Sequence, residues 1–324
     1  MTPALSAPAT PTALVGEELQ LVEQRLGELL RSREGRLTDI AGYLIGGGGK
    51  RARPAVTLLV FRACGGSMLR DVVDVAVALE LIHSASLLHD DIIDGSDVRH
   101  GRDSARHKYG VAETLVTGDF LFSRAFQICG RFDERLIQWA SEACIALTEG
   151  EIMQGRFRRN PAVTYEDYVE IIARKTASLF EVGARTAAYL ANADDGVVEA
   201  MARCGRHVGM TFQMIDDLLD ITAAEATLGK PVGLDVRDGN PSLPVVLAVV
   251  EDDEISRLFA KPQLSESEVA VVLGRLRRSA VVERGHHLAL DHAGRAREAL
   301  HTLPDSPYRQ YLFSLIDQLV ERAS

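Results

Sequence analysis

Apolar residues recur every three or four positions along most of the chain, which is the spacing of helices that bury one face. Residues 71–91 are apolar nearly all round, and this predicts a helix at the centre of the protein. The longest segments with helical spacing, and therefore the main predicted helices, are 16–32, 71–91, 134–157, 165–191 and 197–222.

Glycine and proline gather between these segments, and no alternation of apolar and polar residues marks a β-strand. No stretch has the composition of a linker between domains. Residues 15–324 are therefore predicted to form a single all-α domain. Residues 1–14, rich in Pro, Ala and Thr, are predicted to be a disordered lead.

The composition of the 324 residues excludes several classes of protein. With 46% hydrophobic and 25% charged residues, the chain has the balance of a soluble globular protein, and a net charge of −10 argues against nucleic-acid binding. The N-terminus lacks the basic start of a signal peptide, and no stretch approaches the roughly 20 apolar residues of a membrane span. The four cysteines are far apart, as expected for reduced thiols in a cytoplasmic protein.

Two clusters of three aspartates, with identical spacing, stand at the ends of apolar segments. The first is Asp90, Asp91 and Asp94, and the second is Asp216, Asp217 and Asp220. One such cluster could be a solvated helix end, although carboxylates are unfavourable beside the negative end of the helix dipole. Two clusters facing one cavity would require divalent cations. Oxygen ligands favour Mg²⁺, which usually shares its coordination with substrate phosphates, so a diphosphate between the clusters is predicted.

Basic residues stand close to these clusters. The loop "GGGGKRARP", 46–54, combines a glycine run that lets the backbone approach an anion with Lys50, Arg51 and Arg53. It is not a P-loop, because no Ser or Thr follows the lysine, and alone it could be a solvated basic loop. Arg99 follows the first acid cluster, and Lys175 lies in an apolar segment, where it needs an anion or a path to solvent.

Taken together and in this order, the motifs resemble those of the trans-isoprenyl diphosphate synthases, or polyprenyl synthetases. The likeness covers about residues 40–245 and consists of GGKRARP, ELIHSASLLHDDIID, RHG, TGDFLF, EGE, RKTASLF, FQMIDDLLD and GKPVGLDVRDG. The resemblance implies an array of roughly ten helices around a deep central cavity, usually in a homodimer. It implies a prenyltransferase that joins an allylic diphosphate to isopentenyl diphosphate and releases a membrane-lipid precursor.

The resemblance also implies a role for individual residues. Three Mg²⁺ ions would be held by the six aspartates of the two clusters. The allylic diphosphate would be contacted by Arg99, Lys175 and Lys230. Isopentenyl diphosphate would be contacted by Lys50, Arg53, His83 and His100. The residues beside the reacting carbons, with a catalytic role, would be Lys175, Thr176 and Gln213.

Two positions depart from the family pattern. His100 stands where the family usually has a second arginine, and a histidine is often neutral at pH 7 and cannot offer a bidentate fork. Binding of isopentenyl diphosphate is therefore expected to be weaker unless Arg51 or Arg102 compensates. Asn240 stands where relatives often carry a lysine.

Product length is expected to depend on the depth of the cavity below the first acid cluster. Ala85 and Ser86, about one helical turn before Asp90, are small where short-chain members of the family tend to place aromatic residues. An open tunnel and a hexaprenyl to nonaprenyl product are therefore predicted, with geranylgeranyl diphosphate as the alternative. Trp139 is a candidate for the next barrier, although ordinary core packing is the favoured explanation of this residue.

Two other functions compete with this interpretation. A class I terpene cyclase also uses an aspartate-rich helix and Mg²⁺, but it does not need the GGKRARP loop, and its second metal motif is normally of the Asn/Ser/Glu type. A non-catalytic subunit of a hetero-oligomeric synthase would tend to lack the acid clusters. A catalytic subunit that requires a partner stays open.

Overall fold

The computed structural model describes residues 13–47, 49, 51–99, 101–223 and 232–322, and it confirms the predicted all-α class. The helices are η1 (Ala13–Val15), α1 (Gly16–Leu29), α2 (Gly35–Ile45), α3 (Ala52–Ala63), α4 (Leu69–Ile93), α5 (Ala105–Tyr109), α6 (Val111–Cys129), α7 (Glu134–Phe157), α8 (Tyr165–Ile172), η2 (Ala173–Ala177), α9 (Ser178–Leu190), α10 (Asp195–Thr222), α12 (Leu234–Asp238), α13 (Leu243–Val249), α14 (Asp253–Phe259), α15 (Glu266–Arg278), α16 (Val281–Leu300) and α17 (Pro307–Glu321). The short strands β1 (Val98–Arg99) and β2 (Arg102–Asp103) pair antiparallel.

The main predicted helices are present, with changes at their ends. Helix α7 has the predicted bounds, whereas the segment predicted as one helix over 165–191 is divided into α8, the π-helical turn η2 and α9. Beyond α10 the chain forms the further helices α12 to α17, so the described residues contain more helices than the roughly ten implied by the resemblance. The predicted disordered lead lies outside the described residues, except for Ala13 and Leu14, which belong to a 3₁₀ turn.

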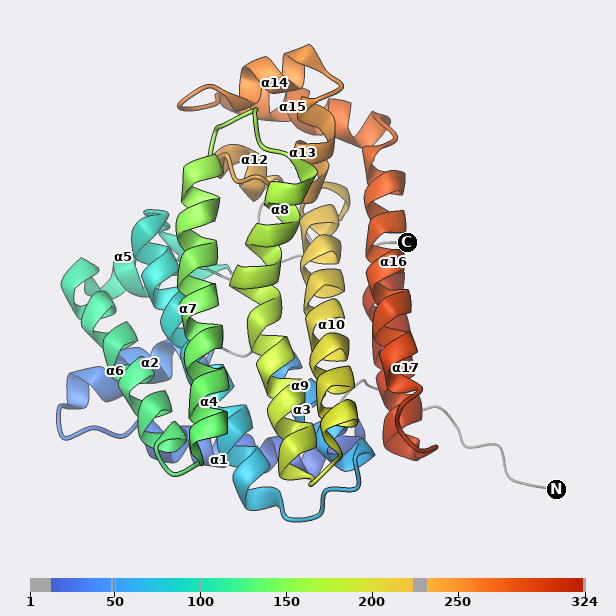
Figure 1. Ribbon diagram of the computed structural model, residues 1–324. Helices are drawn as coiled ribbons and strands as arrows, with labels where there is room; N and C mark the ends of the chain where they lie inside the picture. The colour runs from blue at the N-terminus through green and yellow to red at the C-terminus, as the bar shows by residue number, and fades with distance from the viewer. Residues whose placement is uncertain (1–12, 48, 50, 100, 224–231, 323–324) are drawn as a thin grey trace.

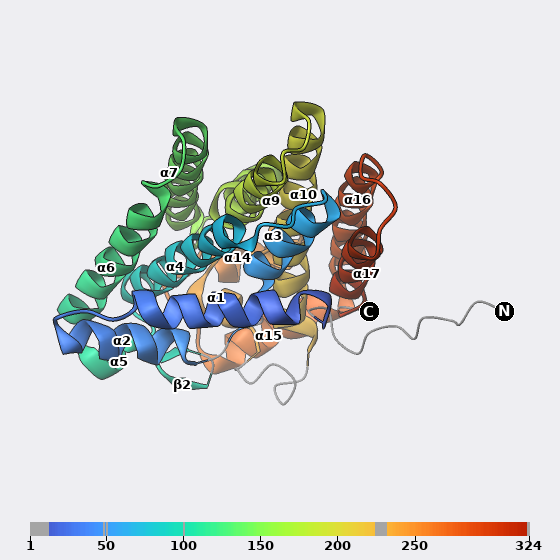
Figure 2. The same ribbon diagram turned by 90° about the horizontal axis from the view of Figure 1, so that it is seen from below.

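The long helices stand side by side, and the short ones close one end of the molecule. Helices α4, α7, α9 and α10 form the centre, while α16 and α17 lie against α10 (Figure 1). Helix α1 crosses beneath α3 and α4 in the second view (Figure 2). Helices α12 to α15 cover the end toward which both α4 and α10 run, so the two acid clusters arrive at the same end (Figure 1).

Helix α4 is the centre of the hydrophobic core. It is long and apolar enough, by length and composition, to cross a membrane, so the expectation that no segment approaches such a span was wrong. However, 78% of its most apolar window is buried inside the protein. The same core joins residues from Val15 to Val320. The apolar character of α4 is thus explained by neighbours on every side.

The π-helical turn η2 lies against α7 at a glycine. A Cβ atom built on Gly150 would come within 2.5 Å of the backbone nitrogen of Lys175 and 2.9 Å of its Cα. Contacts below 3 Å force the backbone to move, so glycine is required for this close approach. Single π-turns inside α-helices widen the helix locally and change the direction of the side chains that follow.

We expect Gly150→Ala to destabilise the protein by about 1–3 kcal/mol, because the added methyl group overlaps the η2 backbone. The measurement is the free energy of unfolding in urea, followed by circular dichroism. Gly155→Ala is the matched control in the same helix, because its Cβ would meet no atom within 4 Å. That substitution should be neutral or stabilise by about 0.5–1 kcal/mol. Equal effects of the two substitutions would contradict the proposed close contact.

Candidate active site

A cavity of about 380 Å³ opens where α4, α7, α8, η2 and α10 meet α12. Acidic residues face it from two sides, with Asp90 on α4 and Asp216 and Asp217 on α10. Other polar residues on its wall are Arg53, His83, Ser86, Arg99, Gln154, Lys175, Thr176, Gln213, Asp235, Asn240 and Ser242. Most of the predicted site residues that the structure describes are therefore brought together, although Arg53 and Asp217 are 164 positions apart in the sequence.

Each aspartate of the first cluster has a basic partner. Arg99 Nε donates to Asp91 Oδ1 at 2.6 Å, and Asp91 is completely buried. The ammonium of Lys175 lies 3.8 Å from Asp90 Oδ2. The negative charges of Asp91 and Asp90 are thus compensated by basic side chains of the same chain, Arg99 from β1 and Lys175 from η2. The third aspartate, Asp94, caps α4 and pairs with Arg158, which follows α7.

The three aspartates of the second cluster do different things. Asp216 lines the cavity. Asp217 accepts hydrogen bonds from Tyr168 Oη at 2.8 Å, from Gln213 Nε2 at 2.8 Å and from the backbone N–H of Leu243 at 3.0 Å. Its carboxylate therefore ties α8 and α13 to α10 while one edge borders the cavity.

Asp220, the last of the cluster, is directed toward the start of α12. Its carboxylate accepts from the backbone N–H groups of Leu234, at 3.4 Å, and Asp235, at 3.1 Å. Of the six predicted metal ligands, Asp90, Asp216 and Asp217 line the cavity, and the other three point to neighbouring elements. Sequence spacing alone treats the two triplets as equivalent, because it does not include the elements that pack against each carboxylate.

Two of the three predicted catalytic residues, Thr176 and Gln213, belong to one hydrogen-bonded series that ends at Asp217. Thr176 Oγ1 donates to Gln213 Oε1 at 2.9 Å, and Gln213 in turn donates to Asp217. Lys175, the neighbour of Thr176 in η2, forms an ion pair with Glu151 of α7. The π-turn thus directs two consecutive side chains to the cavity. Sequence reasoning missed Glu151 and Tyr168, although Glu151 belongs to the EGE motif and could have been found there.

Burial shifts the ionisation of the acids that line the cavity. It raises the pKa of Asp90 to about 7, with Lys175 opposing the shift and Glu151 adding to it. Burial also raises the pKa of Asp217 to about 7, even though its hydrogen bonds act in the other direction. The pKa of Lys175 is raised, because the charges of Asp90 and Glu151 outweigh the opposing effect of burial. A site of this kind favours additional positive charge.

A side pocket adjoins the cavity beside the first acid cluster. His83, Leu87 and Arg99 line both spaces, and Arg51 and Arg102 line only the side pocket. The two arginines that were considered as substitutes for the missing family arginine are thus both present there. The three predicted residues Lys50, His100 and Lys230 lie outside the described residues.

Arg53 reaches the main cavity from α3. Its guanidinium lies over the ring of Phe180, 4.9 Å from the ring centroid, and burial lowers its pKa to about 10. Its Nε is buried without a hydrogen-bond partner. A buried guanidinium with an unused donor beside a cavity is suited to an anionic ligand.

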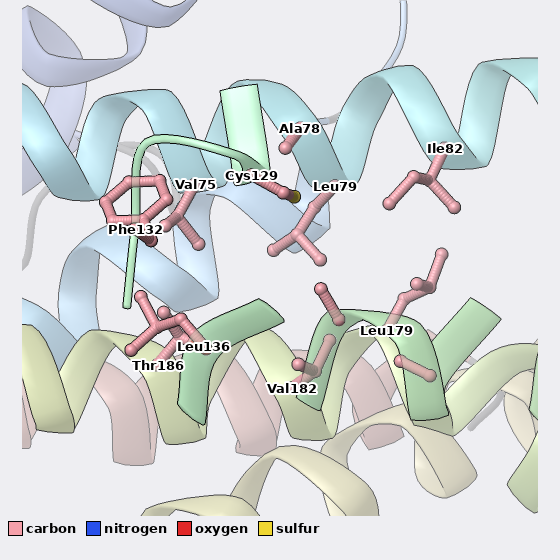
Figure 3. Close-up of a pocket in the computed structure, with 12 residues that line it drawn as sticks. Val75, Ala78, Leu79, Ile82, Cys129, Phe132, Leu136, Leu179, Val182 and Thr186 are labelled. Atoms are coloured by element: carbon pink, nitrogen blue, oxygen red, sulfur yellow. The ribbon is translucent and has the colours of Figure 1, made fainter. Parts of the chain in front are cut away.

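An apolar pocket lies below the cavity, and Figure 3 shows its lining. Three helical segments line both spaces, with residues about one turn apart. The cavity is lined by Ser86 on α4, Leu147 on α7 and Thr176 on η2. The apolar pocket is lined by Ile82 on α4, Ala143 on α7 and Leu179 on α9. The lower end is lined by Val75, Cys129, Phe132, Leu136 and Thr186. The polar cavity and the apolar pocket are therefore consecutive along the same helices.

Two of the predicted chain-length residues lie away from these spaces. Ser86 lines the cavity, but Ala85 is completely buried and is not on its wall. Trp139 packs edge-on against Tyr189, with ring centroids 5.6 Å apart, and lines a separate outer pocket with Arg174. Phe132 and Leu136, which the sequence did not single out, line the apolar pocket instead. The direction of each side chain around its helix, which sequence alone did not resolve, decides this difference.

The carboxylates that line the cavity are the donors that it offers to Mg²⁺. In the part of the chain that the structure describes, no three Asp, Glu, His or Cys side chains are close enough to hold a metal ion by themselves. The carboxylates instead line opposite walls, Asp90 on one and Asp216 on the other, with buried surroundings that favour cations. This fits ions that take few protein ligands and complete their coordination with water and phosphate oxygens.

Comparisons with known proteins agree with this geometry. Residues 34–274 match the family model described as polyprenyl synthetase. The chain is 34% identical to the geranylgeranyl diphosphate synthase of Methanosarcina mazei, covering 93% of this chain and 94% of that protein. It is also 34% identical to the octaprenyl diphosphate synthase of Escherichia coli, covering 95% and 97%.

A solved structure is similar over the whole fold. The polyprenyl synthase of Caulobacter crescentus, crystallised with calcium and isoprenyl diphosphate, superposes with a TM-score of 0.92 at 31% identity, covering 97% of each chain. The family model alone matches well over half of the sequence. The chain therefore belongs to the polyprenyl synthetase family and is a trans-prenyltransferase that condenses prenyl diphosphates.

Proposed function

We propose that the chain condenses an allylic diphosphate with isopentenyl diphosphate, with Mg²⁺ and the side chains of the main cavity assisting departure of the allylic diphosphate. The observation that carries the proposal is the pair of acidic walls, from α4 and α10, with an apolar pocket about one turn away along α4, α7 and α9. A diphosphate would be bound in the charged cavity. A growing prenyl chain would extend toward the apolar pocket, which would have to widen beyond its volume of about 30 Å³ to hold the chain.

The allylic diphosphate would lie between the two acid clusters. Mg²⁺ would be held by Asp90 and Asp216, with the other aspartates of both clusters completing or supporting the site. When bound, Mg²⁺ would neutralise charge on the diphosphate and make it a better leaving group. Arg99 and Lys175 would bind the same diphosphate directly, as the family resemblance also implies for Lys230. Arg99 already pairs with Asp91, and Lys175 lies near Asp90.

Isopentenyl diphosphate would lie nearer to α3 and the side pocket. Arg53, with a buried and unused Nε donor, and His83 face this region. Arg51 and Arg102 would compensate for the family arginine that is replaced by His100, because both line the side pocket next to His83. Lys50 and His100 keep the roles that the resemblance implies.

The remaining residues would orient the reacting carbons and protect them. Thr176 and Gln213 are held by mutual hydrogen bonding on the wall between the two diphosphate regions. The apolar side chains below, Leu147 and Ile172 among them, would exclude water that could otherwise capture the allylic cation. The proton lost after carbon–carbon bond formation would leave with the released diphosphate.

The first test is product analysis with the purified chain, Mg²⁺, farnesyl diphosphate and isopentenyl diphosphate. We expect a linear polyprenyl diphosphate and complete loss of turnover on chelation with EDTA. Asp90→Asn and Asp216→Asn should each lower kcat by roughly 100- to 1000-fold, because each removes charge from the position where diphosphate departs. Glu254→Gln, in a short helix remote from the cavity, is the control and should keep wild-type kcat.

Two results would contradict the proposal. A cyclic hydrocarbon product would identify a terpene cyclase. Absence of turnover until a second protein is added would show that the chain is one subunit of a hetero-oligomeric synthase.

We propose a long-chain product, in the hexaprenyl to nonaprenyl range, with geranylgeranyl diphosphate as the alternative. The support is the small Ser86, about one turn above Ile82 of the apolar pocket, and the extent of that pocket along α4. On α4 the pocket runs from Val75 to Ile82, a rise of roughly 10 Å at about 1.5 Å per residue. Relatives at equal identity make geranylgeranyl and octaprenyl diphosphates, so similarity alone does not select a length.

Product length should respond to the two ends of the pocket. Ser86→Phe should shorten the product, because the ring would narrow the entrance below the acids. Phe132→Ala should lengthen it, because the ring closes the lower end. The measurement is chromatography of the dephosphorylated products. Trp139→Phe is the control, since Trp139 lies outside the pocket and should leave the length unchanged. The interpretation of Phe132 as the floor fails if only the Trp139 variant alters the product.

We propose that two copies of the chain associate through α6 and α7. Several large apolar side chains are exposed on these two helices. They are Leu115, Val116 and Phe126 on α6, and Ile145 and Ile152 on α7, and Ile152 has 72% of its surface accessible. The two helices are neighbours in both views (Figures 1 and 2). An apolar face shared by two adjacent helices is typical of a self-complementary dimer interface.

The double variant Phe126→Glu with Ile145→Glu should be monomeric, because it places four like charges across the interface. We expect the dimer dissociation constant to rise by at least roughly 100-fold, measured by sedimentation equilibrium. Val271→Glu is the control, because Val271 is an exposed apolar residue on α15, away from this face. A wild-type chain that sediments as a monomer, or a double variant that remains dimeric, would refute the proposed interface.

We also propose a cytoplasmic enzyme that delivers a lipid precursor to the membrane. Cys64, Cys129, Cys144 and Cys204 are all unpaired, as is usual in a reducing compartment. The apolar helix α4 is buried in the core and is not available to a membrane.

A further inference from the structure

The segment that joins α7 to α8 carries two consecutive arginines with different partners. Arg158 ends α7 in an extended conformation, and Arg159 follows with a left-handed backbone, φ +59°. The segment runs next to both acid-bearing parts of the fold, the end of α4 and α12. Sequence analysis assigned no role to either arginine.

Arg159 fixes this segment to the end of α12. Its backbone N–H donates to the carbonyl of Gly239 at 2.9 Å, and its guanidinium donates to the carbonyls of Val236, at 3.3 Å, and Arg237. A Cβ on Gly239 would lie 2.2 Å from Arg159 Nε, so the two residues fit together only because position 239 is glycine. Arg158 is consequently held at a defined place beside the acid clusters.

Arg158 contacts the first acid cluster. Its Nη2 donates to Asp94 Oδ1, and the two side chains keep 25% and 20% of their surfaces exposed. The Nε of Arg158 is buried and has no hydrogen-bond partner. A buried donor without a partner is costly, so this guanidinium has one hydrogen-bonding position that only a ligand or water can use.

Asp238 of α12 lies near this pair. Burial raises its pKa, Asp94 adds to the shift, and Arg158 and Arg159 oppose it. Arg158 thus stands between carboxylates that come from α4 and from α12. Its positive charge reduces the repulsion between these carboxylates.

Asp94 has the same relation to Arg158 as Asp91 has to Arg99 and Asp90 to Lys175. Each carboxylate of the first cluster is compensated by one basic side chain from a different element. Arg99 and Lys175 are expected to exchange these carboxylates for the diphosphate when Mg²⁺ is present. Arg158 has the charge and an unused donor to do the same, and it already contacts the last aspartate of the cluster.

We infer that Arg158 is a third diphosphate-binding cation of this site, which holds Asp94 while the metal is absent and binds the diphosphate when Mg²⁺ takes the carboxylate. The inference rests on the proposed function, because it assumes that Mg²⁺ and a diphosphate occupy the cavity. A guanidinium beside Asp94 repels a divalent cation and occupies one of its ligand oxygens. With diphosphate present, the same fork adds two charge-assisted hydrogen bonds.

Two opposite effects on binding follow for Arg158→Gln, and neither requires turnover. Mg²⁺ alone, titrated calorimetrically into the ligand-free protein, should bind about 5- to 10-fold more tightly, since a nearby positive charge is removed. Inorganic diphosphate at saturating Mg²⁺ should bind at least about 10-fold more weakly, since a charged donor is lost. Arg158→Lys should keep wild-type Mg²⁺ affinity and lose part of the diphosphate affinity, because charge remains without the planar fork.

Arg156→Gln is the matched control, because Arg156 is an exposed arginine two positions earlier that packs on Phe157. It should leave both affinities unchanged, and circular dichroism of every variant verifies the fold. Wild-type affinity of Arg158→Gln for either Mg²⁺ alone or Mg²⁺ with diphosphate would overturn the inference. Failure of the wild-type protein to bind diphosphate at any Mg²⁺ concentration would instead overturn the proposed function, so the two failures are distinguishable.

Discussion

The arrangement of this protein depends on one electrostatic constraint, the placement of carboxylates at the C-terminal ends of two largely buried helices. Acids are unfavourable there, because the helix dipole, burial and neighbouring acids all oppose their charge. Basic side chains from other elements compensate the charges of the first cluster. Arg99 comes from the strand pair, Lys175 from the π-turn and Arg158 from the segment after α7. In the proposed function, the same basic residues would exchange these carboxylates for a metal-bound diphosphate.

The π-turn shows how packing supports this electrostatic arrangement. Lys175 reaches Asp90 and Glu151 because α7 approaches η2 closely, and that approach requires Gly150 to have no side chain. Thr176, the next residue, is directed to Gln213 on α10. A regular α-helix through this region would rotate the following side chains differently. Local irregularity at η2 is therefore part of the site, since it lets one short segment serve both the acid wall and the wall that carries Gln213.

The cavity also changes from polar to apolar along its length. Helices α4, α7 and η2–α9 present polar or charged residues at the upper level and aliphatic residues about one turn below, where Phe132 and Leu136 bound the space. A diphosphate and a hydrocarbon chain have opposite requirements for solvation. In the proposed function, consecutive polar and apolar environments along shared helices would let one ligand satisfy both requirements.

The sequence by itself determined the helical class, the main long helices and the two aspartate clusters, because apolar periodicity and repeated charge spacing are local properties of the chain. It also indicated Lys175, Thr176 and Gln213, which the tertiary structure brings to one cavity. The structure alone decided which aspartates face that cavity, that Tyr168 and the N–H of Leu243 hold Asp217, and that Arg158 meets Asp94. It also directed Ala85 and Trp139 away from the cavity and the apolar pocket, and placed Phe132 on the wall of that pocket. These outcomes depend on how helices distant in sequence rotate and approach one another, and no local pattern contains that information.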